Sequence, residues 1–169
     1  MSSSDVAVPE WVLVPGEGIT CGTVGIRLGQ DRASVRQAMG FASCVSNYPD
    51  EDDFKTDDGL FVRVGYGLDG EPSARSIAAQ QNPIDLTAPV RQIMFLGGNL
   101  TYRGVALHDG VKFGQIKQAF KDMGLGFRDS EWMVDGKDCP DLRISIATRR
   151  DVGGDGKQIE WVILATDFT

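Results

Sequence analysis

The densest group of chemically active side chains in this sequence is acidic. Six carboxylates fall within the nine residues from 50 to 58, and two aromatic side chains accompany them. A run of this kind raises the local negative potential and steers a basic partner toward it, while aromatic side chains can anchor the contact. It is also typical of an ordinary solvated loop. The residues predicted to bind a partner in this stretch are Tyr48, Asp50, Glu51, Asp52, Asp53, Phe54, Asp57 and Asp58.

A second, shorter acidic stretch runs from 135 to 141. Asp135 and Asp138 in it are also predicted to bind the partner, provided that both stretches lie on one side of the molecule. Neither stretch has the spaced Asp, Asn and terminal Glu residues of a known calcium-binding loop. The sequence therefore predicts no metal site.

An enzyme remains an alternative, because two neighbouring carboxylates can act as general acid and base in a hydrolase. Asp57 with Asp58, or Asp135 with Asp138, would be such a pair, although a chain with 24 acidic residues contains many pairs. His108 is the only histidine and has no adjacent Ser or Cys motif to activate. We predict no catalytic residues.

The three cysteines do not indicate a cofactor or a disulfide framework. Cys21, Cys44 and Cys139 are an odd number, lie far apart and form no Cys-x-x-Cys pair. A lone histidine cannot complete a usual zinc site with them. We therefore expect a protein without a cofactor.

Composition restricts the class of partner. The chain has 169 residues, 41% of them hydrophobic, and a formal net charge of −7. That charge repels nucleic-acid phosphates and anionic membrane surfaces, so a basic protein is the expected partner. No apolar stretch is long enough for a membrane helix and the start lacks a signal-peptide pattern, which predicts a cytoplasmic protein. The oligomeric state is left open.

Alternation and capping signals predict the elements of the first half. Residues 24–28 alternate as a half-buried strand does. A helix is predicted over 32–39, because Asp31 is a good N-cap and Gly40 can end a helix. The main acidic stretch should then lie in the loop before a strand over 60–67.

The second half repeats this pattern. At a shift of 81 residues, the helix segment 34–39 corresponds to 115–120 in its apolar and charged positions. At a shift of 82, the apolar positions Leu60, Val62 and Val64 correspond to Leu142, Ile144 and Ile146. Self-similarity at a fixed period indicates an internal duplication.

The duplication sets the predicted domain organisation. Residues 1–10 are expected to form a flexible tail, 11–87 a first repeat unit and 88–169 a second one. A single unit is too small to bury a stable core, so the two should pack as one globular domain. The predicted fold class is α+β: two tandem strand–helix–antiparallel-strand repeats forming an extended antiparallel sheet with helices on one face.

A family resemblance follows from the first unit. Gly25-Ile26-Arg27-Leu28-Gly29, followed by Val35 and Gly40 at helix spacing and then by strands, resembles the repeat of the β-lactamase inhibitory protein. It is similar, too, to the related small lipoprotein of the outer-membrane assembly machinery. The paired cysteines of the inhibitor's repeats are absent. The chain also looks like the bacterial immunity proteins, which are small, acidic and poor in catalytic motifs.

These resemblances imply a protein that works by occluding another protein's surface. The predicted function is therefore an inhibitor, in its concrete form an immunity protein that neutralises a bacterial toxin or effector by covering its active site. A small hydrolase with paired carboxylates and a structural or adaptor domain are the alternatives.

Overall fold

The structure, a computed structural model, describes residues 9–46, 48–67, 84–108, 110–131, 136–148 and 159–165. Strands dominate these residues, and they form two sheets. The strands are β1 (Glu10–Val14), β2 (Gly18–Cys21), β3 (Val24–Arg27), β4 (Ser43–Val45), β5 (Glu51–Lys55), β6 (Phe61–Tyr66), β7 (Val90–Gly97), β8 (Asn99–Tyr102), β9 (Val105–Ala106), β10 (Arg128–Asp129), β11 (Gly136–Cys139), β12 (Ile144–Thr148) and β13 (Ile159–Ala165). The helices are α1 (Arg32–Ala38), α3 (Phe113–Asp122) and a short 3-10 helix (Pro140–Leu142).

The larger sheet has eight strands in the order β10-β11-β12-β13-β7-β6-β5-β4, and all its neighbours are antiparallel. Its inner face is apolar. In β6 the buried positions alternate, with Val62, Val64 and Tyr66 turned inward, as the period of a strand requires. At the centre, Phe95 of β7 lies opposite Val162 of β13, and neither is exposed.

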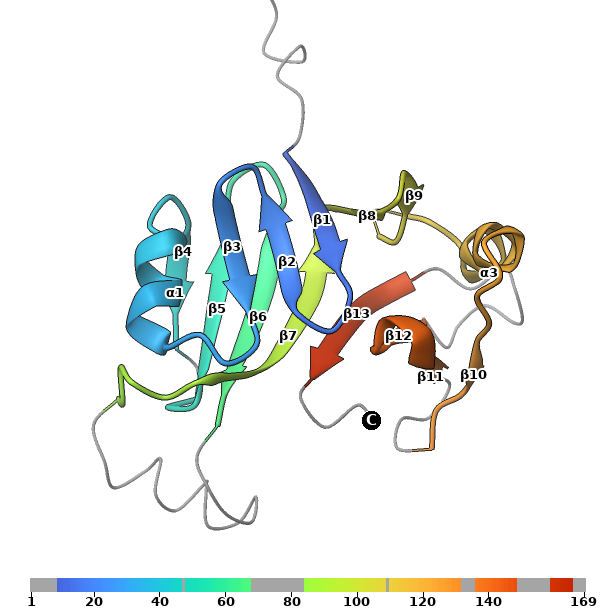
Figure 1. The fold of residues 1–169 in the computed structure, drawn as a ribbon. Helices are drawn as coiled ribbons and strands as arrows, with labels where there is room; N and C mark the ends of the chain where they lie inside the picture. The colour runs from blue at the N-terminus through green and yellow to red at the C-terminus, as the bar shows by residue number, and fades with distance from the viewer. Residues whose placement is uncertain are drawn as a thin grey trace, which may run out of the picture.

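The smaller sheet has five strands in the order β3-β2-β1-β8-β9 and lies against the inner face of the larger one (Figure 1). β1 connects the two halves of the chain, since it pairs antiparallel with β2 and parallel with β8. Trp11, Ile19, Ile26 and Leu100 contribute buried side chains from this sheet. They join the inner face of the large sheet in one hydrophobic core.

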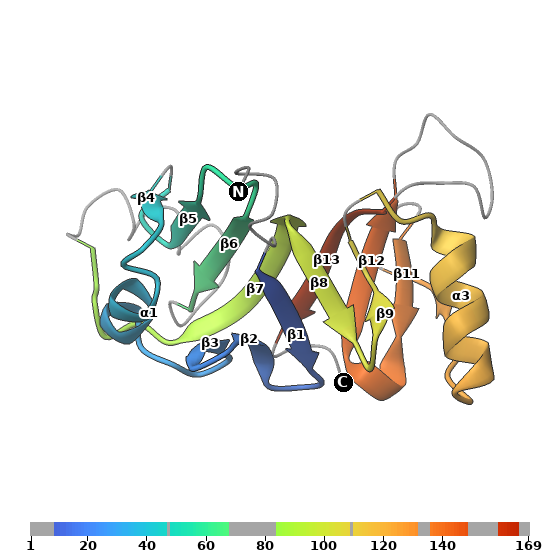
Figure 2. The same cartoon turned by 90° about the horizontal axis from the view of Figure 1, so that it is seen from above.

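Helices α1 and α3 stand at opposite ends of the layer that contains the smaller sheet (Figure 2). The side chain of Asp31 accepts a hydrogen bond of 2.8 Å from the backbone N–H of Ser34, which caps α1. The helix predicted over 32–39 is thus observed as Arg32–Ala38. Within the described residues, no helix has both the length and the apolar character needed to cross a membrane.

The order of elements in the first half occurs again in the second. The hairpin β2–β3, the helix α1 and the strands β4 to β7 are followed by the hairpin β8–β9, the helix α3 and the strands β10 to β13. β7 and β13 meet at the middle of the large sheet, where Met94 lies opposite Ile163. Val62 and Ile144 correspond to each other in the sequence at the shift of 82. Val62 pairs with a residue of β7, and Ile144 pairs with a residue of β13.

The predicted α+β fold class, with helices covering one face of an extended sheet, is wrong. The protein is mostly β, and a second sheet occupies the middle of the layer in which only helices were expected. The strand predicted over 24–28 is observed as β3 of this second sheet. A separate sheet was not predicted, because its strands are two to five residues long, too short for their alternation to show which sheet they join. The glycines around residues 16–22 favour a turn in the sequence, but residues 18–21 form β2.

The predicted boundaries of the tail and of the two units can be compared with the observed strands. Glu10, assigned to the flexible tail, begins β1 and lies opposite Asn99. The predicted division of the chain at residues 87 and 88 falls just before β7, and it stays a prediction, as does the duplication. The sequence also predicts a strand over 75–79 and a glycine-rich turn over 152–156, and both segments lie outside the described residues.

Candidate functional site

Most of the main acidic stretch is a strand and not a loop. Glu51–Lys55 forms β5, which lies between β4 and β6 in the large sheet. The side chains of Asp52 and Phe54 point inward and are 0% exposed, and Asp53 is buried on the outer face. The prediction that this stretch lies in a loop is therefore wrong for these residues. Their charge is balanced inside the protein by arginines from other elements.

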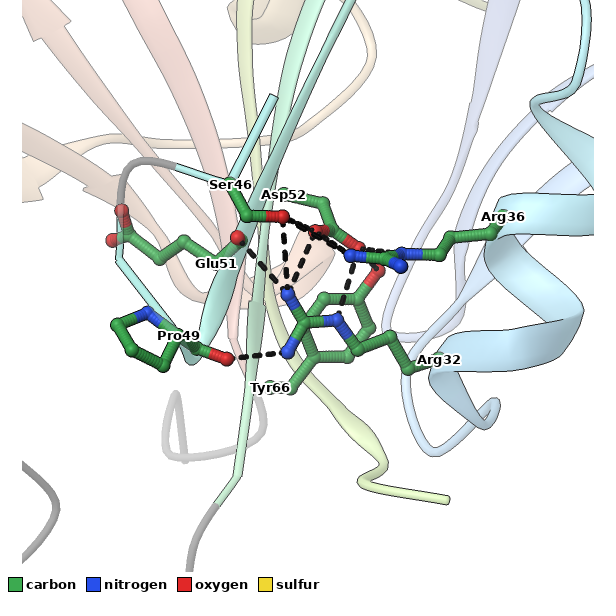
Figure 3. A network of polar contacts seen from close by, with 7 residues as sticks. All are labelled: Arg32, Arg36, Ser46, Pro49, Glu51, Asp52 and Tyr66. Atoms are coloured by element: carbon green, nitrogen blue, oxygen red, sulfur yellow. Dashed lines mark hydrogen bonds and ion pairs between the residues drawn. The ribbon is translucent and has the colours of Figure 1, made fainter. Parts of the chain in front are cut away.

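Asp52 is the centre of a buried polar network (Figure 3). Arg32 donates to its two oxygens at 3.1 and 2.7 Å, and Arg36 donates to the same oxygens at 3.0 and 2.9 Å. The hydroxyl groups of Ser46 and Tyr66 also donate to it, at 2.6 and 2.9 Å. A buried carboxylate is tolerated when it is paired and hydrogen-bonded in this way.

The same network fixes the backbone between β4 and β5. Arg32 donates to the carbonyl oxygen of Pro49 and, at 3.2 Å, to that of Glu51. Its guanidinium carbon also lies 4.6 Å from the centre of the Tyr66 ring, a cation–π contact. Planar guanidinium groups suit such multiple contacts. Residue 46 and residues 48–51, here called the network loop, are thus held to α1 through Ser46, Pro49 and Glu51.

The ionisation of the network indicates a structural role. Burial by itself would raise the pKa of Asp52, but hydrogen bonds from Arg36, Arg32 and Ser46 outweigh it and hold the pKa well below its usual range. Burial, followed by the charge of Asp52, raises the pKa of Tyr66 above its usual range. Burial is also the first cause of the raised pKa of the Cys44 thiol. An acid or base catalyst needs a pKa near the working pH, and these three groups have pKa values that have moved away from it.

The network loop presents an exposed aromatic side chain. Tyr48 lies on this loop and is 63% exposed, and Val45 in the neighbouring strand β4 is 51% exposed. β4 is the end strand of the large sheet. An exposed tyrosine beside an apolar side chain and a sheet edge is a common composition for a protein-binding surface.

Charged residues on the outer face surround these two side chains. Val45 lies opposite Asp53, and Asp53 lies opposite Arg63, so all three share the outer face of the sheet. Arg63 donates to Asp53 at 2.8 Å and lies 4.0 Å from Glu51. This surface is called the Tyr48 patch below, and its members are Val45, Tyr48, Glu51, Asp53 and Arg63.

The pKa of Arg63 supports this grouping. The hydrogen bond to Asp53 raises that pKa, burial opposes the change, and the charge of Glu51 and the nearby Tyr48 raise it further. Tyr48 therefore lies close enough to Arg63 to act on it.

Other predicted partner-binding residues lie elsewhere. Asp57 and Asp58 are exposed in the turn between β5 and β6, beyond the other end of β5 from Asp50, which is partly buried. The structure does not bring this acidic pair into the Tyr48 patch. Asp138 is buried in β11 and accepts a hydrogen bond from the hydroxyl of Ser145. Asp135 lies outside the described residues.

The sequence interpretation missed the basic half of the site. Arg32 and Arg36 are one helical turn apart, and Arg32 lies on the face of α1 that also carries Val35 and Met39. An arginine in line with two buried apolar residues is a signal for a buried acidic partner. Nothing comparable pointed to Tyr66, because in the sequence it only continues the apolar alternation of Val62 and Val64.

The single histidine of the sequence lies against the backbone of β13. His108 is buried, and its Nε2 lies 3.0 Å from the carbonyl oxygen of Glu160. Because a carbonyl only accepts, this nitrogen is the donor. Among the described residues, no three potential metal ligands are grouped together.

No protein-family model matches the chain, and neither a curated protein nor a solved structure matches it. The resemblance to tandem-repeat inhibitors and immunity proteins therefore stays a prediction. Any function has to be argued from the molecule's own surface.

Proposed function

We propose that the protein is a protein-binding inhibitor that docks through the Tyr48 patch onto a basic partner. The observation that carries this proposal is an exposed tyrosine on a loop that a buried ion network holds in place. Tyrosine is enriched among the residues that dominate binding energy. A loop fixed before binding loses little conformational entropy on association.

Charge supports a basic partner. The Tyr48 patch contains two carboxylates and one guanidinium group, and the whole chain carries a formal charge of −7. Acidic surfaces of this kind accelerate encounter with a basic protein. Glu51, which is partly buried and lies 4.0 Å from Arg63, can also exchange this ion pair for one with an incoming basic side chain.

The proposed mechanism is occlusion. The negative field steers the partner toward the patch, Tyr48 and Val45 fill apolar depressions on its surface, and the body of the large sheet then covers the partner's working site. The concrete form that we propose is an immunity protein that neutralises a bacterial toxin or effector. No catalytic step by this chain is part of the mechanism.

Site-specific photocrosslinking tests this proposal. A benzoylphenylalanine residue replaces Tyr48 in one variant and Lys121, an exposed residue of α3, in a control variant. After irradiation in the source cell, we expect the Tyr48 position to form one discrete adduct with a basic protein, and the Lys121 position to lack it.

The identity of the adduct decides the outcome. A basic protein whose activity falls when the unmodified chain is added would support inhibition. Identical adducts at both positions, or an irradiated sample with no adduct at Tyr48, would overturn the proposed docking surface. An adduct of twice the chain mass would instead assign the patch to a dimer of this protein.

A further inference from the structure

A pocket lies between the two sheets, away from the outer face that carries the Tyr48 patch. Its volume is about 230 Å³. Trp11 of β1 and Val24 of β3 form one wall, Leu60 before β6 forms the other, and Phe41 stands at the end of α1 beside them. Trp11 and Leu60 are almost completely buried, whereas Phe41 is largely exposed.

The walls of this pocket suit a small apolar body. The four side chains that form them are two aromatic and two aliphatic ones. A protein cavity of about 150 Å³ with similar walls holds one benzene molecule. The pocket therefore has room for a single ring with a short substituent, and burying that ring is favourable by the hydrophobic effect.

The polar groups at this pocket favour one sign of charge. Asp58 is its ionisable acid, and Thr56 donates a hydrogen bond to it. Burial, followed by the charge of Glu10, raises the pKa of the Cys21 thiol. The thiol is therefore uncharged at neutral pH, and the negative charge of Glu10 acts on this side of the pocket. Among the described residues that line the pocket, none is Lys, Arg or His.

We infer that this pocket binds a compact organic cation, a primary alkylamine that carries one aromatic ring at the end of its short alkyl chain. The ring lies between Trp11 and Leu60, and the ammonium group faces the carboxylate of Asp58. Apolar walls with a single charged group that fixes orientation are the usual composition of a small-molecule site. An anion of the same shape is repelled by the same carboxylate.

Protection of Cys21 from alkylation tests this inference at the site itself. The full chain carries Cys44→Ser, because Cys44 is exposed and Cys139 is buried, which makes Cys21 the reactive thiol. The probes are phenethylamine, phenethyl alcohol and phenylacetate, and the measured quantity is the rate of modification by N-ethylmaleimide. We expect the amine to protect at a concentration about fivefold lower than the alcohol, the factor for one ion pair in water at about 4 Å, and phenylacetate to protect least.

Two further variants separate the contribution of the Asp58 charge from that of the apolar pocket. Asp58→Asn should remove the difference between amine and alcohol while both still protect Cys21. Val24→Trp should fill the pocket and abolish protection by every probe, with an unchanged circular dichroism spectrum as the check on folding.

Equal protection by amine and alcohol in the protein with Asp58 intact would overturn the charge preference. Absence of protection by any probe would overturn the pocket as a binding site. Neither result bears on the Tyr48 patch, because the probes act on residues that are not part of it.

Discussion

Asp52 accepts hydrogen bonds from four side chains although none of its surface reaches solvent. Two of the donors are arginines, so the network carries more positive than negative charge. Arg36 is partly exposed, so its positive charge remains in contact with water. The arrangement is stable only as a unit, because removal of the one carboxylate leaves the buried guanidinium group of Arg32 without a counter-charge.

The first prediction at this scale concerns stability. Asp52→Asn should lower the free energy of unfolding by about 3–5 kcal/mol, the usual cost of breaking a buried ion pair. The control is Asp57→Asn in the exposed turn, which should change it by less than about 0.5 kcal/mol. Urea denaturation measures both values. Similar stabilities for the two variants would show that the network contributes little.

The second prediction concerns pH. The folded-state pKa of Asp52 is depressed, so its stabilising contribution is complete above its unfolded-state pKa of about 3.9 and is lost as the pH falls toward the folded-state value. The difference in unfolding free energy between the wild-type protein and Asp52→Asn should therefore be largest at neutral pH and shrink below about pH 4. Denaturation at a series of pH values measures it, and a constant difference would contradict the assignment.

At the scale of elements, the sequence was informative where a pattern is long. The helix over 32–39 and the alternation in β6 both follow from apolar spacing and capping. The burial of Asp52 could not be predicted in the same way. Its two arginine partners lie 16 and 20 residues earlier in the chain. An acidic run does not indicate which of its carboxylates will contact an arginine in the folded protein.

The position of α1 should control the order of the network loop. Asp31→Ala removes the N-cap of this helix, which costs about 1 kcal/mol. Because α1 carries Arg32 and Arg36, the loop should also become more mobile. Hydrogen exchange at the amide of Glu51, which donates to the carbonyl of Tyr48, should accelerate more than the loss of global stability explains.

Gln118→Ala, at an exposed position in α3, is the matched control for this exchange experiment. It should leave the amide of Glu51 unchanged. Equal acceleration in both variants would mean that the loop is not held through α1.

At the scale of the whole molecule, the two halves share an order of elements but not a surface. In the large sheet, Arg63 lies opposite Met94 and Ser145 lies opposite Ile163, so these two residues occupy corresponding places. Arg63 is 34% exposed, whereas Ser145 is 1% exposed. Among the described residues of the second half, the place that corresponds to the partly exposed Arg63 is therefore occupied by a buried, uncharged side chain.

This difference predicts the stoichiometry. A protein with one Tyr48 patch should bind one partner molecule per chain, even though its elements repeat. Native mass spectrometry of the complex with the captured partner measures the ratio. Two partner molecules on one chain would show that the second half also docks and that the patch is not the unique determinant.

The most direct measurement is the dissociation constant of that complex for the wild-type protein and for Tyr48→Ala, with Lys121→Ala as the control. We expect Tyr48→Ala to weaken binding about 30-fold, the equivalent of an interface residue contributing about 2 kcal/mol, mainly through faster dissociation, while the control stays within twofold. Equal dissociation constants for the wild-type protein and Tyr48→Ala would contradict docking through this surface.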